Sequence, residues 1–384
     1  MNRNRMLSLP AALLALILLT GCGAGRGVFA NYRPIEALLL VETLGLDLAD
    51  SGGLWLSAAA ARDAEGVETL DAFAPGLVQG LEALQDRAGG GRVFFSHCQS
   101  FVLGEDYARR GVGGLFDYVE RDIHTRMGAH LFVVRDSAAA ALVAGGDSPQ
   151  ADVSALLAAV RSETEARGDS HVFDVRETAV ALSEQGAGLI CALRLIHAGE
   201  SAEAGLSAVP AGYGILKDGR LVGYLDWGEA RAASLLLGVL GRIPLSLTTS
   251  TGGAATVYMR CGAPEIRCRR REDGGLALDL RAAPEAELAA VEGGADWTDP
   301  AAAAALATAV NEAIRDDLDH VLARAKALDA DFLALSRVLR RAGFDLKTLP
   351  ADWLRTLEAT VTVDTTLTRS DGLAAPLGVA GGGA

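Results

Sequence analysis

The sequence predicts an α+β fold of several domains, with mainly antiparallel or mixed sheets flanked by helices. The first observation is a pair of β-rich runs, 214–217 and 220–225, on either side of Asp218-Gly219. Asp-Gly between such runs is typical of a type I′ hairpin, because both residues accept a positive φ at low cost. The second and third lie near the C-terminus, where 301–328 carries an apolar stripe at helical spacing and 359–367 alternates like a half-buried strand.

The N-terminus has the layout of a lipoprotein signal peptide over residues 1–21. Two arginines among the first five residues precede an apolar run, 7–19, which is shorter than the roughly 20 residues that a membrane-spanning helix needs. The run ends at Leu19-Thr20-Gly21-Cys22, the layout of a lipobox. We therefore expect cleavage before Cys22 and a diacylglycerol anchor on its thiol, which would give stable membrane attachment. The alternative is an ordinary signal peptide with a chance cysteine.

Composition argues against several classes of partner. With 35 Lys+Arg against 49 Asp+Glu, the formal charge of −14 repels nucleic acid and offers no attraction to anionic lipid. Membrane attachment would therefore depend on the acyl group. The cysteines after Cys22 form no CxxC motif, which argues against a zinc site or a dithiol redox site.

The chain after Cys22, about 360 residues, is too long for one small core. Turn-forming stretches at 145–149, 198–205, 241–244 and 293–300 suggest where domains end. The expected divisions are an N-terminal α+β domain over 22–146, a middle α+β domain over 147–244, a C-terminal α+β domain with a long helix over 245–375, and a flexible tail over 376–384.

The N-terminal domain is expected to begin with a hairpin. Its strands are 38–48 and the run starting at 54–56, joined by Asp50-Ser51-Gly52-Gly53. The spacing of leucines then predicts a helix at 73–87. The elements expected after it are a strand at 92–103, a helix at 114–120, a strand at 129–134 and a helix at 137–143.

The middle domain is expected to contain helices at 153–167, 175–185 and 230–240, a strand at 189–195 and the Asp-Gly hairpin. In the C-terminal domain we expect strands at 254–260, 265–270 and 276–281. The long helix should begin with Asp299 as cap and Pro300 at its first position. Its charged side chains opposite the apolar stripe, Asp317 and Arg324 among them, are interpreted as a solvated face.

Cys261 and Cys268 stand on either side of the turn at 262–264. If the two strands beside this turn formed one hairpin, the thiols could come within bonding distance, although the geometry of a disulfide across a ladder is restrictive. A disulfide and a pair of free thiols both remain open.

No catalytic or metal-binding motif is visible. The six histidines never form HxH or HExxH, and there is no GxSxG elbow or phosphate-binding loop. In Ser96-His97 and Ser170-His171 the residues are adjacent, so on a strand their side chains would face opposite sides. We therefore predict a protein that is not an enzyme and has no cofactor and no metal.

Several separated segments share an order with one known family. They are Arg33-Pro34-Ile35-Glu36, Ser96-His97, Leu103-Gly104-Glu105-Asp106-Tyr107-Ala108-Arg109-Arg110-Gly111, Gly212 to Leu225, Glu229-Ala230-Arg231, Ala330-Asp331-Phe332, and Trp353 with Val361 and Val363. Together with the lipobox, they resemble the Ger(x)C family, the lipoprotein C subunits of spore germinant receptors. The chain departs from the family in two places. The family usually has Trp-Asp directly after the cysteine, whereas here Gly23 to Asn31 intervenes and suggests a longer tether, and Leu333-Ala334-Leu335 stands where the family has glycines.

The resemblance implies a three-domain α+β lipoprotein on the outer face of the spore inner membrane. It would assemble with integral membrane subunits of the A and B types and would not catalyse a reaction. The candidate positions for the partner interface, each of which also has a purely structural interpretation, are Glu120, Arg121, Asp122, Glu229, Arg231 and Trp353. The rival hypotheses are an envelope solute-binding lipoprotein, which would have two similar lobes with parallel sheets, and a surface hydrolase.

Overall fold

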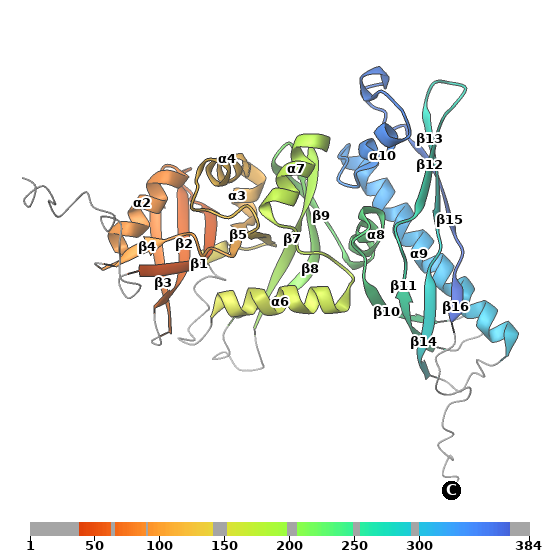
Figure 1. Ribbon diagram of the computed structural model, residues 1–384, viewed down its shortest axis with the longest axis horizontal. Helices are drawn as coiled ribbons and strands as arrows, with labels where there is room; N and C mark the ends of the chain where they lie inside the picture. Colours follow the sequence, from red (N-terminus) through yellow and green to blue (C-terminus); the bar gives the residue numbers. More distant parts are fainter. Residues whose placement is uncertain are drawn as a thin grey trace, which may run out of the picture.

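The computed structural model describes residues 38–62, 66–89, 91–140, 152–197, 206–248, 254–292 and 299–368. The expected signal peptide, Cys22 and the tail lie outside the described residues, and so do residues 141–143 of the helix expected at 137–143. Within the described residues the chain is α+β with mixed sheets flanked by helices, as predicted. Figure 1 shows a body built on one large sheet, joined to a C-terminal body of smaller sheets and a long helix.

The large sheet has nine strands in the order β3-β2-β1-β5-β6-β7-β8-β9, with β4 beside β1. Its central strands β1, β5, β6 and β7 are parallel, and antiparallel pairs extend it on both sides. The bounds of the strands are β1 Leu38–Leu48, β2 Leu54–Arg62, β3 Gly66–Ala74, β4 Arg92–Phe94, β5 Ser100–Gly104, β6 His130–Val134, β7 Ala187–His197, β8 Leu206–Lys217 and β9 Arg220–Leu225.

Helices cover both faces of this sheet, because its central parallel strands are apolar on both sides. Helices α2 (Leu77–Arg87), α3 (Glu105–Arg110), α4 (Gly113–Arg121) and α7 (Val175–Gln185) pack on one face. Helix α6 (Val153–Arg167) packs on the other, against Phe132 and Leu193. Strand β6 pairs with β7, so a single sheet joins the regions expected as N-terminal and middle domains.

The C-terminal body contains two smaller sheets, β10-β11-β14-β16 and β12-β13-β15, with helix α9 (Pro300–Leu328) packed along them. Its core also takes in the start of β7 and part of β8, which binds this body to the large sheet. The other bounds are α8 Trp227–Leu237, β10 Arg242–Thr248, β11 Ala254–Arg260, β12 Glu265–Arg270, β13 Leu276–Ala282, β14 Glu285–Glu292, α10 Leu335–Arg341, η3 Leu346–Thr348, β15 Glu358–Val363 and β16 Thr366–Thr368.

Two local signals in the sequence formed the elements that they predicted. Asp218 and Gly219 have φ values of 49° and 71°, as a type I′ turn between β8 and β9 requires. Helix α9 begins at Pro300, where the side chain of Asp299 accepts a hydrogen bond from the Ala301 backbone N–H at 3.0 Å. Its buried residues follow the predicted stripe from Leu306 to Ala325.

Several predicted boundaries are wrong because of pairing or capping. The strand expected at 359–367 is divided into β15, which pairs with β13, and β16, which pairs with β14 in the other small sheet. The helix expected from Phe73 begins at Leu77, since Phe73 pairs with Trp55 across β2 and β3. The strand expected at 92–103 is divided into β4 and β5. The helix expected at 230–240 begins at Trp227, because Asp226 and Glu229 form a capping box there.

The expected hairpin between β11 and β12 does not form. Strand β11 pairs with β10 and β14, whereas β12 pairs with β13 in the other small sheet. The pairing that favoured a disulfide is therefore absent, and Cys261 and Cys268 are both free thiols. Sequence proximity was misleading here because the strands that follow each other along the chain belong to different sheets.

Candidate functional site

Glu120, Arg121 and Asp122 lie at the C-terminal end of α4 and have different roles. Glu120 and Arg121 are exposed, and the Arg121 guanidinium pairs with Asp117 at 2.8 Å one turn earlier. Asp122 caps the turn after the helix by accepting hydrogen bonds from the Tyr118 hydroxyl and the Thr125 hydroxyl. Burial alone would raise the pKa of Asp122, but these hydrogen bonds and that from the His124 backbone lower it. Of the three, Glu120 and Arg121 are therefore exposed, whereas Asp122 is engaged within the fold.

Glu229 and Arg231 lie on α8 and connect this helix to α9. The Arg231 Nε donates to Asp317 at 2.7 Å, and both side chains are less than one-fifth exposed. Arg324 Nε donates to Glu229 at 3.2 Å. The prediction of a solvated charged face on α9 is therefore wrong at Asp317, which packs against α8, whereas Arg324 is exposed as predicted although it also contacts Glu229. Glu229 and Arg231 hold the two helices together, which leaves little of either side chain for a partner.

Trp353 is half-buried against the C-terminal core, in the segment after η3. The structure therefore distributes the six candidate interface residues among the end of α4, helix α8 and this segment, and does not bring them together as one surface. Figure 1 shows α4 in the large-sheet body and α8 beside the C-terminal body.

The structure also shows a cluster of two carboxylates that the sequence analysis did not predict. It lies at the carboxyl ends of β1 and β5. Asp47 is 7% exposed, and it accepts backbone hydrogen bonds from Ala139 at 2.6 Å and Ala140 at 2.8 Å. Glu105 accepts from the Tyr224 hydroxyl at 2.9 Å and from the backbone N–H of Asp136 at 2.6 Å. Both carboxylates thus hold connecting loops in place.

Burial raises the pKa of Asp47, although its two backbone hydrogen bonds oppose this. Burial alone would also raise the pKa of Glu105, but the hydrogen bonds from the Asp136 N–H, Arg109 and Tyr224 together lower this pKa. The segment Leu103 to Gly111 stood in the family resemblance, yet no local pattern could show that Glu105 meets Tyr224, 119 positions later.

Position 104, beside this cluster, has no room for a side chain. A Cβ at this position would lie 2.0 Å from Asp47 Oδ1 and 3.3 Å from the backbone nitrogen of Ala139. We expect Gly104→Ala to lower the free energy of unfolding by about 2–3 kcal/mol, because the methyl group must displace Asp47 from its two hydrogen bonds. Chemical denaturation measures this loss.

The matched control is a double-mutant cycle with Asp47→Ala. Removing the Asp47 carboxylate makes room for the methyl group, so the double variant should be about as stable as Asp47→Ala alone. Strictly additive losses would show that the steric contact with Asp47 is not the cause.

A hollow of about 550 Å³ lies at the N-terminus of α8 and is lined by Asp226, Trp227, Gly228, Glu229, Asp317 and His320. Its carboxylates already cap α8 or pair with arginines. Arg167 covers one face of the Trp227 ring at 4.9 Å. Within the described part of the chain, no group of His, Cys, Asp and Glu side chains could hold a metal ion.

Neither adjacent Ser-His pair lies on a strand: Ser96-His97 is part of a turn, and Ser170-His171 lies outside any strand, where the Ser170 hydroxyl donates to Asp169. The ring of His171 faces Glu177 at 3.3 Å, and its backbone N–H donates to the Tyr213 hydroxyl. Burial raises the pKa of both Cys98 and Cys191 to about 12, which makes their thiols poor nucleophiles. Among the described residues we find no convergent acid, base and nucleophile, and no helix long and apolar enough to cross a membrane.

Comparisons with known proteins agree with the resemblance found in the sequence. Residues 31–191 match the family model described as spore germination protein N-terminal domain, and residues 211–371 match that described as spore germination B3/GerAC like, C-terminal. No curated protein matches the chain.

A solved structure, the crystal structure of the GerBC protein, is similar over 84% of this chain and 96% of that chain. Its TM-score is 0.56 and its sequence identity is 16%, so this likeness concerns the fold. The expected membership of the Ger(x)C family is confirmed by the two family models, which follow each other along most of the sequence. The chain belongs to the GerAC-like family of spore germination proteins.

Proposed function

We propose that this chain is the lipid-anchored C subunit of a nutrient germinant receptor. It is held through Cys22 at the outer face of the spore inner membrane, and it assembles with integral membrane subunits of the A and B types without catalysing a reaction. The observation that carries the proposal is the pair of family matches in tandem, 31–191 and 211–371, behind a lipobox.

The geometry supports a scaffold rather than a catalyst. The partly buried charges at Asp47, Glu105, Glu229 and Asp317 are engaged by backbone N–H groups, a tyrosine or arginines of the same chain. Each of these four carboxylates therefore contributes to the fold. Side chains that hold the fold together in this way are suited to a body that presents a surface to partner subunits.

The rival solute-binding lipoprotein would have two similar lobes with parallel sheets. Only the large sheet has a parallel centre, and the C-terminal sheets are mainly antiparallel and pack on one long helix. The two bodies therefore lack the likeness that this alternative needs.

Deleting the gene tests the proposal in spores. We expect loss of the response to one class of nutrient germinant and reduced accumulation of the partner subunits, while germinant-independent release stays unaffected. Germination assays and immunoblots of spore membranes measure the two effects, with the restored wild-type gene as control. Normal germination to every nutrient tested, with partner subunits at ordinary levels, would contradict the proposal and revive the solute-binding alternative.

A further inference from the structure

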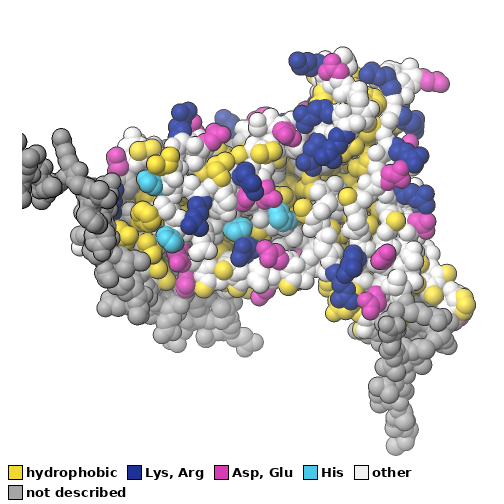
Figure 2. Space-filling model, in the orientation of Figure 1, with side chains coloured by type: hydrophobic (Ala, Val, Ile, Leu, Met, Phe, Trp, Pro, Cys, Tyr) yellow, Lys and Arg dark blue, Asp and Glu magenta, His cyan; other side chains and the backbone are white. Residues whose placement is uncertain are grey.

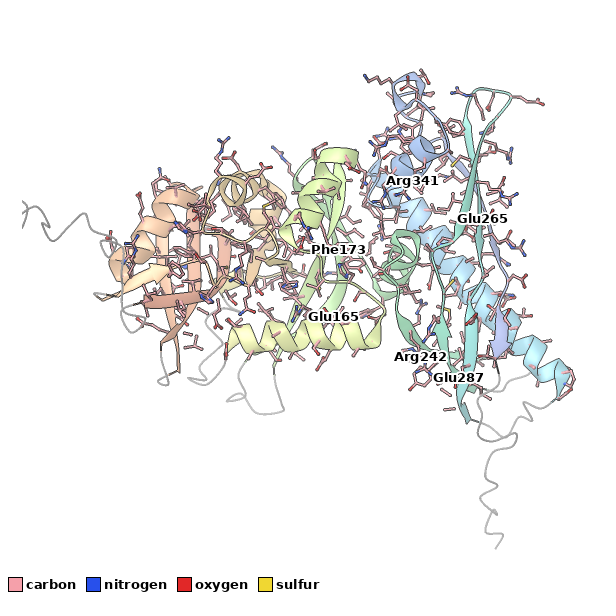
Figure 3. All side chains as sticks on the ribbon, viewed as in Figure 1. Glu165, Phe173, Arg242, Glu265, Glu287 and Arg341 are labelled. Carbon is pink, nitrogen blue, oxygen red and sulfur yellow. The ribbon has the colours of Figure 1, made fainter. Side chains whose placement is uncertain are left out.

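A cleft of about 380 Å³ lies where the large-sheet body meets the C-terminal body, between α7, the end of α8 and the segment before α10. Its floor is mainly apolar and includes Phe173, Leu237, Val239 and Phe332. Figure 3 labels Phe173 at this junction, between the large sheet and α8. On its edge Val180 of α7 is 50% exposed.

Cations gather around this cleft although the chain as a whole has a net charge of −14. Figure 2 shows Lys and Arg side chains over α10 and the loop beyond it. Arg176 and Arg337 line the cleft itself. The exposed cations beyond its rim are Arg340 and Arg341 of α10, Lys347 of η3 and Arg270 of β12, whose guanidinium lies 5.9 Å from the Phe344 ring.

Most of these cations lack an acidic partner. Among the described residues, Arg337, Arg341, Arg270 and Lys347 have no ion pair, and Arg340 reaches Glu184 only at 3.6 Å. The lining itself holds two arginines and two carboxylates: Arg176 pairs with Asp174, Glu184 with Arg340, and Glu177 accepts from the Asp174 backbone N–H. The positive charge without an acidic partner therefore lies at Arg337 and along the rest of α10, beside the apolar floor.

Helix stability explains only part of this pattern. Arg340 and Arg341 lie in the last turn of α10, where cations favour the helix dipole. Arg337 lies in the first turn, where the dipole opposes a cation. The helix dipole therefore does not explain Arg337.

We propose that this cleft is the docking site for an acidic, amphipathic segment of an integral membrane partner subunit. The inference rests on the proposed function and names the surface through which that assembly takes place. An apolar side chain of the segment fills the cleft, and neighbouring carboxylates meet Arg337 and Arg341, in the manner of a helix laid in a groove.

Charge and shape favour this occupant. An acidic segment is repelled by a chain whose net charge is −14, and it is attracted locally to Arg337 and Arg341, which have no ion pair among the described residues. A flat bilayer would meet the exposed arginines but would not reach an apolar floor that lies within a cleft. The partner is therefore a protein segment rather than a lipid surface.

A photo-crosslinking amino acid at position 180 tests the location in spores that carry the full-length chain. The matched control is position 78, since Val78 on α2 is also an exposed helical valine, 54% exposed against 50%. We expect a covalent adduct with an integral membrane subunit from position 180 and none from position 78. No subunit adduct from position 180, or adducts only with lipid or with a second copy of this chain, would overturn the inference.

Charge reversal tests the rim. Arg337→Glu with Arg341→Glu should lower the recovery of the membrane subunits with the tagged chain by about tenfold or more, because like charges then face each other. The control, Arg87→Glu with Arg126→Glu, reverses two exposed arginines of the large-sheet body and should leave recovery unchanged. Equal recovery from both would refute the docking site, whereas the proposed function would still stand if gene deletion abolishes the response.

Discussion

Replacing Cys22 by alanine should detach this protein from the membrane, either as soluble mature chain or as uncleaved precursor. The net charge of −14 gives no attraction to anionic lipid, so attachment should depend on the acyl group. Acyl chains contribute about 0.8 kcal/mol for each buried CH₂, and at least two are needed for stable anchoring. We expect nearly all of the membrane-bound protein to be lost, together with the nutrient response. Fractionation of spore membranes measures the first effect.

Two controls separate anchoring from other consequences. Cys268→Ala removes a thiol that is only partly buried and should remain at the membrane. Fusing an unrelated transmembrane helix in front of the Cys22→Ala chain should restore membrane attachment and, if position alone is needed, the response. A correctly cleaved Cys22→Ala chain that stays tightly on the membrane would contradict the anchor.

The second large effect is expected at the contact between α8 and α9. Arg231→Ala should lower the free energy of unfolding by about 2–4 kcal/mol, because it leaves the Asp317 carboxylate without its guanidinium in a partly buried site. Burial already raises the pKa of Asp317 even though Arg231 opposes it. The loss should therefore shrink as pH falls through the raised pKa, since the protonated acid tolerates burial. Denaturation at neutral and acidic pH measures both effects.

The chain offers a matched control in Arg121, another candidate interface residue. Its pair with Asp117 is more than half exposed on both sides, so Arg121→Ala should leave the free energy of unfolding nearly unchanged. Replacing Arg231 and Asp317 together, by Met and Leu, should recover most of the stability. Similar losses for Arg231→Ala and Arg121→Ala would show that the α8–α9 pair is not an internal contact.

The sequence did not reveal the ion-pair partners that are distant along the chain. The sequence placed Glu229 and Arg231 in a family segment but could not show that their partners are Arg324 and Asp317, 95 and 86 positions away. The same limit hid the cleft at α7 and α10, because Val180 and Arg337 are ordinary residues of two separate helices. The two residues line one cleft only because the large sheet and the C-terminal body pack together.

What the sequence by itself determined is the set of elements fixed by neighbouring residues. Helix α9 follows from its apolar stripe and from Asp299-Pro300, and the β8–β9 hairpin follows from Asp218-Gly219, since capping and turn conformations depend on a few consecutive residues. The α+β class and the family likewise followed from the order of such local signals along the chain.

The tertiary structure alone decided which strands pair and which charges are internal. Strand β12 follows β11 but pairs with β13, and one sheet crosses the boundary expected between the first two domains. Strand edges offer the same backbone donors and acceptors whatever their sequence, so the partner is chosen by how apolar faces pack over long separations. For the same reason Asp317 is an internal partner of Arg231, while a similar carboxylate, Asp117, remains at the surface.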